Sequence, residues 1–227
     1  MALQKDFLWG GALAAHQFEG GVLNTSKGYS VADVMTAGAH GVPREITDGV
    51  VEGKYYPNHV GIDFYGHYKE DIAMFADMGF KCFRLSIAWS RIFANGGMEG
   101  EQPLEEGLKF YDEVILELEK HHMEPLITIC HDEMPMHLAL KYGGWSNRYV
   151  IECYVKYCKT LFERYGKRCK YWLTFNEINA VRGFGPCGTR ESDGKVRYQA
   201  DHHMFVASAK AVILGHQMMP GSMFGAM

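Results

Sequence analysis

The sequence predicts an α/β protein built on a parallel sheet, and three observations carry this prediction. Short apolar runs typical of buried strands alternate with longer segments of helical periodicity. The alternation recurs about every 45 residues after the first unit, which is typical of βα units rather than of a helical solenoid. Polar residues follow the apolar runs directly, as they do at the carboxyl ends of parallel strands. A chain of 227 residues holds one sizeable core, so we expect a single domain over residues 1–227.

The first expected strand is the apolar run Phe7–Ala15, which contains paired glycines and is followed by a polar tip at His16–Gly20. Residues 21 to 60 keep no sustained period and are rich in Gly, Asn, Thr, Ser and Pro, which predicts a long loop. Long loops in compact domains are commonly functional. A helix ended by Gly79 is expected next, because apolar residues form one stripe at spacings of three and four: Tyr65, Tyr68, Ile72, Phe75 and Met78.

The second expected strand, Phe80–Ile87, alternates so that Cys82, Arg84 and Ser86 share one face. An arginine inside a sheet is expected to need a carboxylate partner. A second helix follows, with Pro103 in its first turn and a stripe formed by Leu104, Leu108, Tyr111, Ile115 and Leu118.

The third and fourth expected strands end in residues suited to chemistry. The run Pro125–Cys130 leads into His131, Asp132 and Glu133, and the run Tyr171–Phe175 leads into Asn176 and Glu177. The helix between them has the stripe Val150, Tyr154, Tyr157, Leu161 and Tyr165. After a Gly-rich loop from 183 to 194, a further helix is expected to turn Phe205, Val206, Ala209, Val212 and Ile213 inward, and a fifth strand is expected to begin at Ser222.

Two parallel architectures compete for this pattern. A doubly wound sheet commonly carries a Gly-rich GxGxxG turn after its first strand, and that motif is absent here. A (β/α)8 barrel brings the residues after every strand to one mouth, where the active site lies. The barrel is favoured because the polar residues fall where it needs them: Gln17, Arg84, His131, Asn176 and Glu177.

Composition and charge exclude several classes of partner. The chain is 47% hydrophobic and 22% charged, which is ordinary for a globular protein, and its net charge is −4 with scattered Lys and Arg. We therefore expect no nucleic-acid partner and no membrane partner. The N-terminal segment Met1–Asp6 lacks a basic stretch leading into an apolar run, so a cytoplasmic location is expected.

Neither a metal nor another cofactor is expected. The six cysteines form no CxxC pair, which indicates reduced and largely buried thiols. The eleven histidines include the neighbours His121 and His122 and the neighbours His202 and His203, but neighbouring helical residues point in different directions. No HExxH motif or ladder of Cys and His ligands occurs in the sequence.

Four blocks of this sequence resemble glycoside hydrolase family one, the family of β-glucosidases and 6-phospho-β-glucosidases. They agree with the motifs of that family in order and spacing and cover nearly the whole chain: Trp9–Gly20, Phe83–Ile92, His131–Pro135 with Gly143–Trp145, and Thr174–Glu177. The resemblance implies a (β/α)8 TIM barrel that hydrolyses β-glycosides with retention of the anomeric configuration. It implies that Glu177 is the acid/base, that Asn176 contacts the sugar 2-hydroxyl, and that Gln17 and His131 bind the sugar. Arg84 matches the cation that orients the nucleophile.

The resemblance is closer to 6-phospho-β-glucosidases than to plant β-glucosidases, because Glu133-Met134-Pro135 follows His131 and Ile178-Asn179 follows Glu177. It therefore implies hydrolysis of 6-phospho-β-glucosides in carbohydrate catabolism. An unphosphorylated β-glucosidase or β-galactosidase fragment remains an alternative. Asp132 departs from the family, which commonly has an aromatic residue at this position.

The resemblance covers the N-terminal half of the barrel only, about four βα units and the start of the fifth strand. The nucleophile motif of the family, Ile/Val-Thr-Glu-Asn-Gly on the seventh strand, does not occur in these 227 residues. We therefore expect this chain alone to be inactive, and a non-catalytic truncated half-barrel is a further alternative. An open sheet has two unpaired edges, so we expect a homo-oligomer or aggregation through them.

Overall fold

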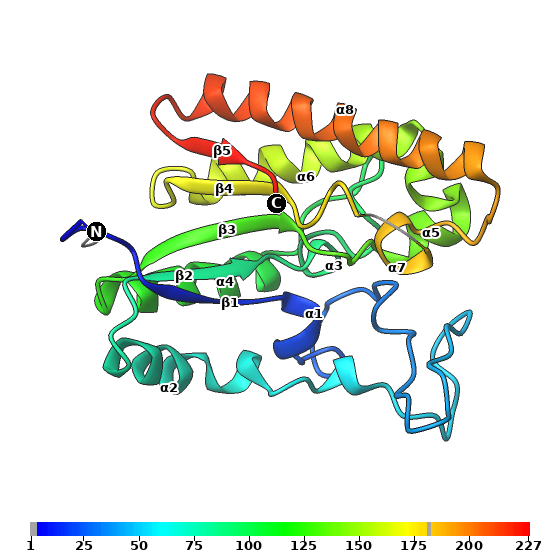
Figure 1. Ribbon diagram of the computed structural model, residues 1–227, viewed down its shortest axis with the longest axis horizontal. Coiled ribbons are helices and arrows are strands. Elements are labelled where there is room, and N and C mark those ends of the chain that lie inside the picture. The colour runs from blue at the N-terminus through cyan, green and yellow to red at the C-terminus, as the bar shows by residue number, and fades with distance from the viewer. Residues whose placement is uncertain (1–3, 181–182) are drawn as a thin grey trace.

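The computed structural model describes residues 4–180 and 183–227, and it consists of one five-stranded parallel sheet with helices (Figure 1). Residues 1–3, where the N-terminal segment considered above begins, lie outside the described residues. The strands are β1 Gly10–Leu13, β2 Cys82–Ser86, β3 Glu124–Cys130, β4 Tyr171–Phe175 and β5 Met223–Gly225.

The strands lie side by side in the order in which they occur along the chain, from β1 to β5, and every neighbouring pair is parallel. A doubly wound sheet would reverse direction at its switch point, whereas consecutive addition of strands is the order of a (β/α)8 barrel. The barrel interpretation is therefore confirmed, and β1 and β5 form the two edges of the sheet in this chain.

Helices follow every strand from β1 to β4, and the long ones lie outside the sheet in Figure 1. The segments that follow the strands gather at one end of the sheet, at the right of the figure, together with α1, α5 and α7. The helical elements are α1 Ala15–Phe18, η1 Pro57–His59, α2 Phe64–Asp77, α3 Trp89–Ile92, α4 Glu105–Lys120, α5 Met136–Tyr142, η2 Gly144–Ser146, α6 Tyr149–Tyr165, α7 Phe184–Cys187 and α8 Gly194–Met218.

The two faces of the sheet differ in burial. In β2, Phe83 and Leu85 are fully buried against the helices, whereas Cys82 and Arg84 are half-buried on the opposite face. Since side chains alternate along a strand, one face carries the helix-packed core and the other carries the polar groups. This alternation was predicted from the sequence.

Helix α6 provides the aromatic centre of the core. Its predicted stripe is fully buried, and Tyr157 stacks on Trp89 with ring centroids 5.2 Å apart. The buried tyrosine hydroxyls find acceptors, because Tyr157 donates to the carbonyl of Ile87 at 2.8 Å and Tyr154 donates to that of Thr174 at 2.6 Å. These bonds fix the ends of the strands, where the polar residues begin.

The predicted inward face of α8 was wrong for Phe205, Ala209 and Ile213, which are exposed, whereas Val206 is partly buried against the core. Phe205 and Ile213 are 51% and 60% exposed. Four of the six buried residues of α8 are Ala or Gly, and the six are Ala200, His203, Met204, Ala207, Ala211 and Gly215. Small residues let a helix approach its neighbours closely. A Cβ on Gly215 would lie 2.2 Å from the ring of Phe224 in β5, so this glycine permits the contact.

Three other expectations need correction at the ends of elements. Met78 is 69% exposed, because α2 ends at Asp77 before the stripe reaches it. The first strand is shorter than expected, and Gln17 lies in α1 rather than at a strand tip. The short helices α5 and α7 were not predicted, because segments of seven and four residues are too short to show helical periodicity. The long loop from 21 to 60 is confirmed, with η1 near its end.

Candidate active site

The predicted site residues lie in the middle of β2, directly after β3 and β4, and in α1. The register of β3 and β4 pairs Cys130 with Phe175, and the backbone N–H of Asn176 donates to the carbonyl of Cys130 at 3.0 Å. This pairing brings the segment that begins at His131 beside Asn176 and Glu177. The fold therefore places the ends of β3 and β4 side by side, as the strand-end argument predicted.

Arg84 and Asn176 make direct contact. The guanidinium Nη2 of Arg84 donates to Oδ1 of Asn176 at 2.8 Å, and its Nε donates to Oγ1 of Thr128 at 2.9 Å. The expectation of a carboxylate partner is corrected, because these hydrogen bonds go to an amide and a hydroxyl. Burial lowers the pKa of Arg84, and the negative charge of Glu177 opposes this effect.

His131 contributes a neutral imidazole. Burial, aided by the charge of Arg84, lowers the pKa of His131 to about 4. The ring of His16 lies edge-on to it with centroids 5.9 Å apart, and burial lowers the pKa of His16 to about 4 as well. A neutral imidazole can both donate and accept hydrogen bonds, as sugar hydroxyls require. Sequence analysis did not single out His16, although its position directly before Gln17 was the available signal.

Gln17 and Glu177 are both exposed in this structure. Glu177 follows β4 at a left-handed φ of 42°. The carboxyl group that is partly buried at this end of the sheet is Asp132. Burial raises its pKa to about 6, and the charge of Glu177 adds to the effect.

A cavity of about 500 Å³ opens at this end of the sheet, and Gln17, His16 and Asp132 line it. The other predicted site residues are not in its described lining: Arg84, His131, Asn176 and Glu177. The cavity lies between α1, the long loop and α7, and the loop supplies about half of its lining, so the long loop has a structural role at this end of the sheet. Polar side chains of Gln17, Arg44, Asn58 and Asp132 face apolar ones of Met35, Tyr55 and Ile62. This mixture of hydrogen-bonding and apolar groups suits a polyhydroxylated ligand.

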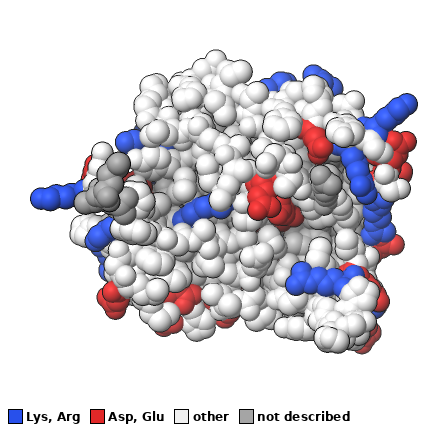
Figure 2. Space-filling view, viewed as in Figure 1, with Lys and Arg blue, Asp and Glu red and all other residues white. Residues whose placement is uncertain are grey.

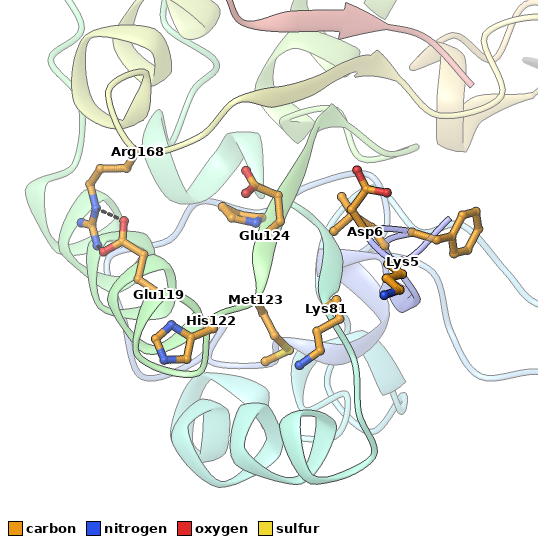
Figure 3. Close-up of a pocket in the computed structure, with 11 residues that line it drawn as sticks. Lys5, Asp6, Lys81, Glu119, His122, Met123, Glu124 and Arg168 are labelled. Carbon is orange, nitrogen blue, oxygen red and sulfur yellow. Dashed lines mark hydrogen bonds and ion pairs between the residues drawn. The ribbon is translucent and has the colours of Figure 1, made fainter. Parts of the chain in front are cut away.

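A second cavity, of about 510 Å³, lies at the opposite ends of the strands (Figure 3). Lys81 precedes β2, Glu124 begins β3, and Arg168 is paired with Glu119 through Nε at 2.8 Å. Active sites of parallel α/β barrels lie at the carboxyl ends of the strands. We therefore assign the candidate active site to the carboxyl ends of the strands, although the two cavities are of similar volume.

One buried ion pair fixes the segment that follows Gln17. Arg91 in α3 donates through Nε to Oε2 of Glu19 at 3.0 Å and through Nη2 to the carbonyl of Gly20 at 2.8 Å. The hydroxyl of Tyr111 donates to the same carboxylate and accepts from the N–H of Ala88 at 2.7 Å. This network holds the segment after Gln17 to α3 and α4, and it was not predicted from the sequence.

The parts of the chain that the structure describes give little support for a metal site or a membrane-spanning helix. There, no three His, Cys, Asp or Glu side chains come close enough to hold a metal ion. The six cysteines are free thiols, and Cys82 is the one of them that is half-buried rather than buried. Within residues 4–180 and 183–227, helices of the length and apolarity needed to cross a membrane are absent. Figure 2 shows acidic side chains near the middle of the face seen in Figure 1 and basic ones at separate points around it.

Comparisons with known proteins identify the family. The family model described as "Glycosyl hydrolase family 1" matches residues 1–227. The chain is 53% identical to the aryl-phospho-β-D-glucosidase BglA of Bacillus subtilis over 99% of this chain and 49% of that protein. It is 47% identical to the 6-phospho-β-glucosidase of Clostridium longisporum over 100% of this chain and 48% of that protein.

A solved structure supports the same conclusion. The family 1 β-glucosidase from Thermotoga maritima superposes with a TM-score of 0.83 at 32% identity, over 99% of this chain and 48% of that one. The chain spans about half the length of the relatives it matches. Its five parallel strands correspond to the first part of their TIM barrel. By family model, sequence identity and fold, the chain belongs to glycosyl hydrolase family 1.

Proposed function

We propose that this chain carries the acid/base side of the active site of a retaining 6-phospho-β-glucosidase. The observation that carries the proposal is the arrangement at the end of β4, where Glu177 follows an Asn176 whose side chain is held by Arg84. A carboxyl group can donate a proton to the leaving glycosidic oxygen, and an amide can bind the 2-hydroxyl as the transition state forms. The printed names of the relatives support phosphorylated glucosides as substrates.

The remaining roles follow from the same arrangement. Gln17 and the neutral His131 offer both donors and acceptors to the sugar hydroxyls. The cation of Arg84 is held by two hydrogen bonds and orients the nucleophile. Retention requires two carboxyl groups about 5 to 5.5 Å apart across the scissile bond. The nucleophile motif is absent from these 227 residues, so we propose that the nucleophile comes from outside them.

The reaction needs neither a metal nor another cofactor, because both proton transfer and nucleophilic attack use carboxyl groups. A cytoplasmic location fits the proposal. A phosphorylated sugar is too strongly charged to cross a bilayer unaided, and the six free thiols suit a reducing compartment.

A chimaera tests the proposal. The 227-residue chain is joined to the other half of BglA, with which it shares 53% identity, so that the second half supplies the nucleophile. We expect hydrolysis of an aryl 6-phospho-β-glucoside and much slower hydrolysis of the unphosphorylated glycoside. Preference for the unphosphorylated glucoside or galactoside would contradict the substrate assignment. A folded chimaera that binds these sugars but hydrolyses none of them would favour the non-catalytic alternative.

The role of Glu177 is tested in the same chimaera by Glu177→Gln, which keeps the shape and removes the transferable proton. Hydrolysis of substrates with poor leaving groups should fall by about 10²- to 10⁴-fold. A dinitrophenyl glycoside needs no protonation, so its glycosylation step should be largely retained, and azide should restore its turnover. The matched control is Glu191→Gln, which changes an exposed carboxylate in the loop before α8. Equal losses for both leaving groups would show that Glu177 is not the acid.

A further inference from the structure

The side chain of Arg84 crosses one strand to reach the next. The register pairs Arg84 with Leu126, and Thr128 lies two residues further along β3 on the same face of the sheet. Asn176 follows β4, on the far side of β3. Strands β2 and β4 are two strand spacings apart, about 9 to 10 Å. The guanidinium group that links them therefore passes over β3, and Thr128 is the residue of β3 to which it bonds.

Thr128 is a fixed anchor for this side chain. It is 0% exposed, it lies on the middle strand of the sheet, and its carbonyl accepts from the N–H of Ile87 at 3.1 Å. Its hydroxyl accepts from Nε of Arg84 at 2.9 Å, while Nη2 of the same group donates to Asn176 at 2.8 Å. Nε and Nη2 form one edge of a planar group, so two bonds from this edge fix both its position and its plane.

The guanidinium group in turn fixes the amide of Asn176. Oδ1 of this amide accepts from Arg84, so its N–H groups face away from the guanidinium. The opposite orientation would set amide donors against arginine donors, and arginine has no acceptor. Asn176 is also buried, and its backbone is bonded to β3 through the carbonyl of Cys130. The amide is thereby fixed in the orientation that presents its N–H donors to a ligand.

We propose that Thr128 is a positioning residue, which acts through Arg84 to fix the Asn176 amide as a donor, and that the site thereby selects β-glycosides with a hydrogen-bond acceptor at C2. This inference rests on the proposed function, because it takes the sugar 2-hydroxyl as the ligand of Asn176. A 2-hydroxyl accepts from the amide, whereas a 2-deoxy sugar has nothing to accept with. The bond strengthens in the transition state, so the selection acts on kcat more than on KM.

Hydrogen exchange of the Arg84 Nε–H in the 227-residue chain tests the anchoring without any catalytic assay. Arg190 is an exposed reference, because its Nε makes no hydrogen bond among the described residues. The Arg84 proton should exchange about 3- to 10-fold more slowly than that of Arg190, since one hydrogen bond must open first. Thr128→Val keeps the shape and removes the acceptor, so this protection should be lost and the amide signals of Asn176 should move. Thr128→Ser keeps the hydroxyl and should keep both.

Kinetics of the chimaera provide the second readout, with an aryl 6-phospho-β-glucoside and its 2-deoxy analogue as substrates. In Thr128→Val, kcat for the 2-hydroxy substrate should fall about 3- to 10-fold more than kcat for the 2-deoxy substrate, which is the contribution of one hydrogen bond. A loss common to both substrates reports on the nucleophile, which Arg84 also orients. Thr128→Ser should retain the preference for the 2-hydroxyl.

The matched control is Thr174→Val, which removes a buried threonine hydroxyl from the neighbouring strand β4. That hydroxyl bonds to Oγ of Ser208 at 2.7 Å and to the carbonyl of Gly225 at 3.2 Å rather than to Arg84. The control should lower stability, because a buried hydrogen bond is lost. It should leave both the exchange rate of Arg84 and the ratio of the two substrates unchanged.

Three results would count against the inference. An Arg84 Nε–H that exchanges as fast as that of Arg190 in the unsubstituted chain would overturn it, whether or not the valine variant folds. Equal losses for the 2-hydroxy and 2-deoxy substrates in Thr128→Val would show that Thr128 has a structural role only. An inactive unsubstituted chimaera would refute the proposed function and the selection at C2 with it, while the exchange rates would still decide whether Thr128 positions Arg84.

Discussion

The buried carboxyl group of Glu133, directly after Asp132, provides a direct test of the electrostatics next to the candidate site. It is 1% exposed, and neither of its carboxyl oxygens has a hydrogen-bond partner among the described residues. The nearby charges already form pairs, since Arg91 binds Glu19 and Lys27 binds Asp33. An ionised Glu133 would therefore add an uncompensated buried charge. Burial raises its pKa well above the usual range, and the charges of Glu19 and Asp33 add to this, so the folded protein holds the proton.

Because the folded state retains this proton, the free energy of unfolding should fall as pH rises. The unfolded chain releases it near the ordinary pKa of 4.5, whereas the folded chain retains it. Above that pH the folded state binds more protons than the unfolded state, so stability falls as pH rises, until Glu133 ionises in the folded state too. The slope is about 1.4 kcal/mol per pH unit while the folded state alone holds the proton, so the loss by pH 7 is on the order of a few kcal/mol. Glu133→Gln keeps the shape and removes this loss.

The assay is urea unfolding of the 227-residue chain and of Glu133→Gln at several pH values between about 4.5 and 7.5. The difference in the free energy of unfolding should move in favour of the glutamine variant as pH rises. Glu124→Gln, at the half-buried start of the same strand, serves as the control and should show no such trend. A constant difference between the chain and the glutamine variant across this range would refute the reasoning, because Glu133 would then titrate alike in both states.

The remaining predictions concern packing, assembly and activity. Ala211→Leu, on the buried face of α8, should destabilise the chain by about 1–3 kcal/mol, whereas Ala209→Leu, on the exposed face, should be nearly neutral in thermal unfolding. The unpaired edges at β1 and β5 should make the chain self-associate, and a monodisperse monomer in light scattering at micromolar concentration would contradict this. The chain alone should not turn over an aryl β-glucoside or its 6-phosphate. Turnover that Glu177→Ala abolishes, with a glycosyl group trapped on this chain, would disprove that expectation.

The parts of the fold that were predicted correctly are those in which burial follows a simple period. Strand β3 is apolar because both of its faces are covered for most of its length, and α6 buries a regular stripe. The prediction failed for helix α8. Its larger apolar residues occur on several faces, and its buried face consists mostly of Ala and Gly, which allow close packing against neighbouring elements. Ala207 and Ala211 are buried whereas Phe205 is exposed, and no periodicity of large residues reveals such a face.

In the candidate site, too, some features could be predicted from the sequence and others could not. The proximity of Arg84 and Asn176 could be anticipated, because Arg84 lies on β2 and Asn176 directly follows β4 in one parallel sheet, but the sequence predicted a carboxylate partner for Arg84 rather than this amide. The exposure of Glu177 could not, because it depends on a left-handed turn that the local sequence Asn-Glu-Ile does not specify. The proximity of His16 and His131 also arises from tertiary packing, since α1 turns back over the end of the sheet after only four residues of β1.

Arg84 links the fold to the proposed chemistry most directly. A guanidinium has five N–H donors, and the described hydrogen bonds to Thr128 and Asn176 use two of them. Both acceptors are neutral, so the bonds fix the plane of the group without neutralising its charge. No carboxylate among residues 4–180 and 183–227 forms an ion pair with it. A cation that is half-buried, held in place and left without a bonded counter-ion favours a negative charge nearby. Within these residues the carboxyl group of Glu177 is the negative charge that acts on Arg84, and it directly follows the amide that Arg84 holds, so one cation ties the two residues at the end of β4 to the sheet.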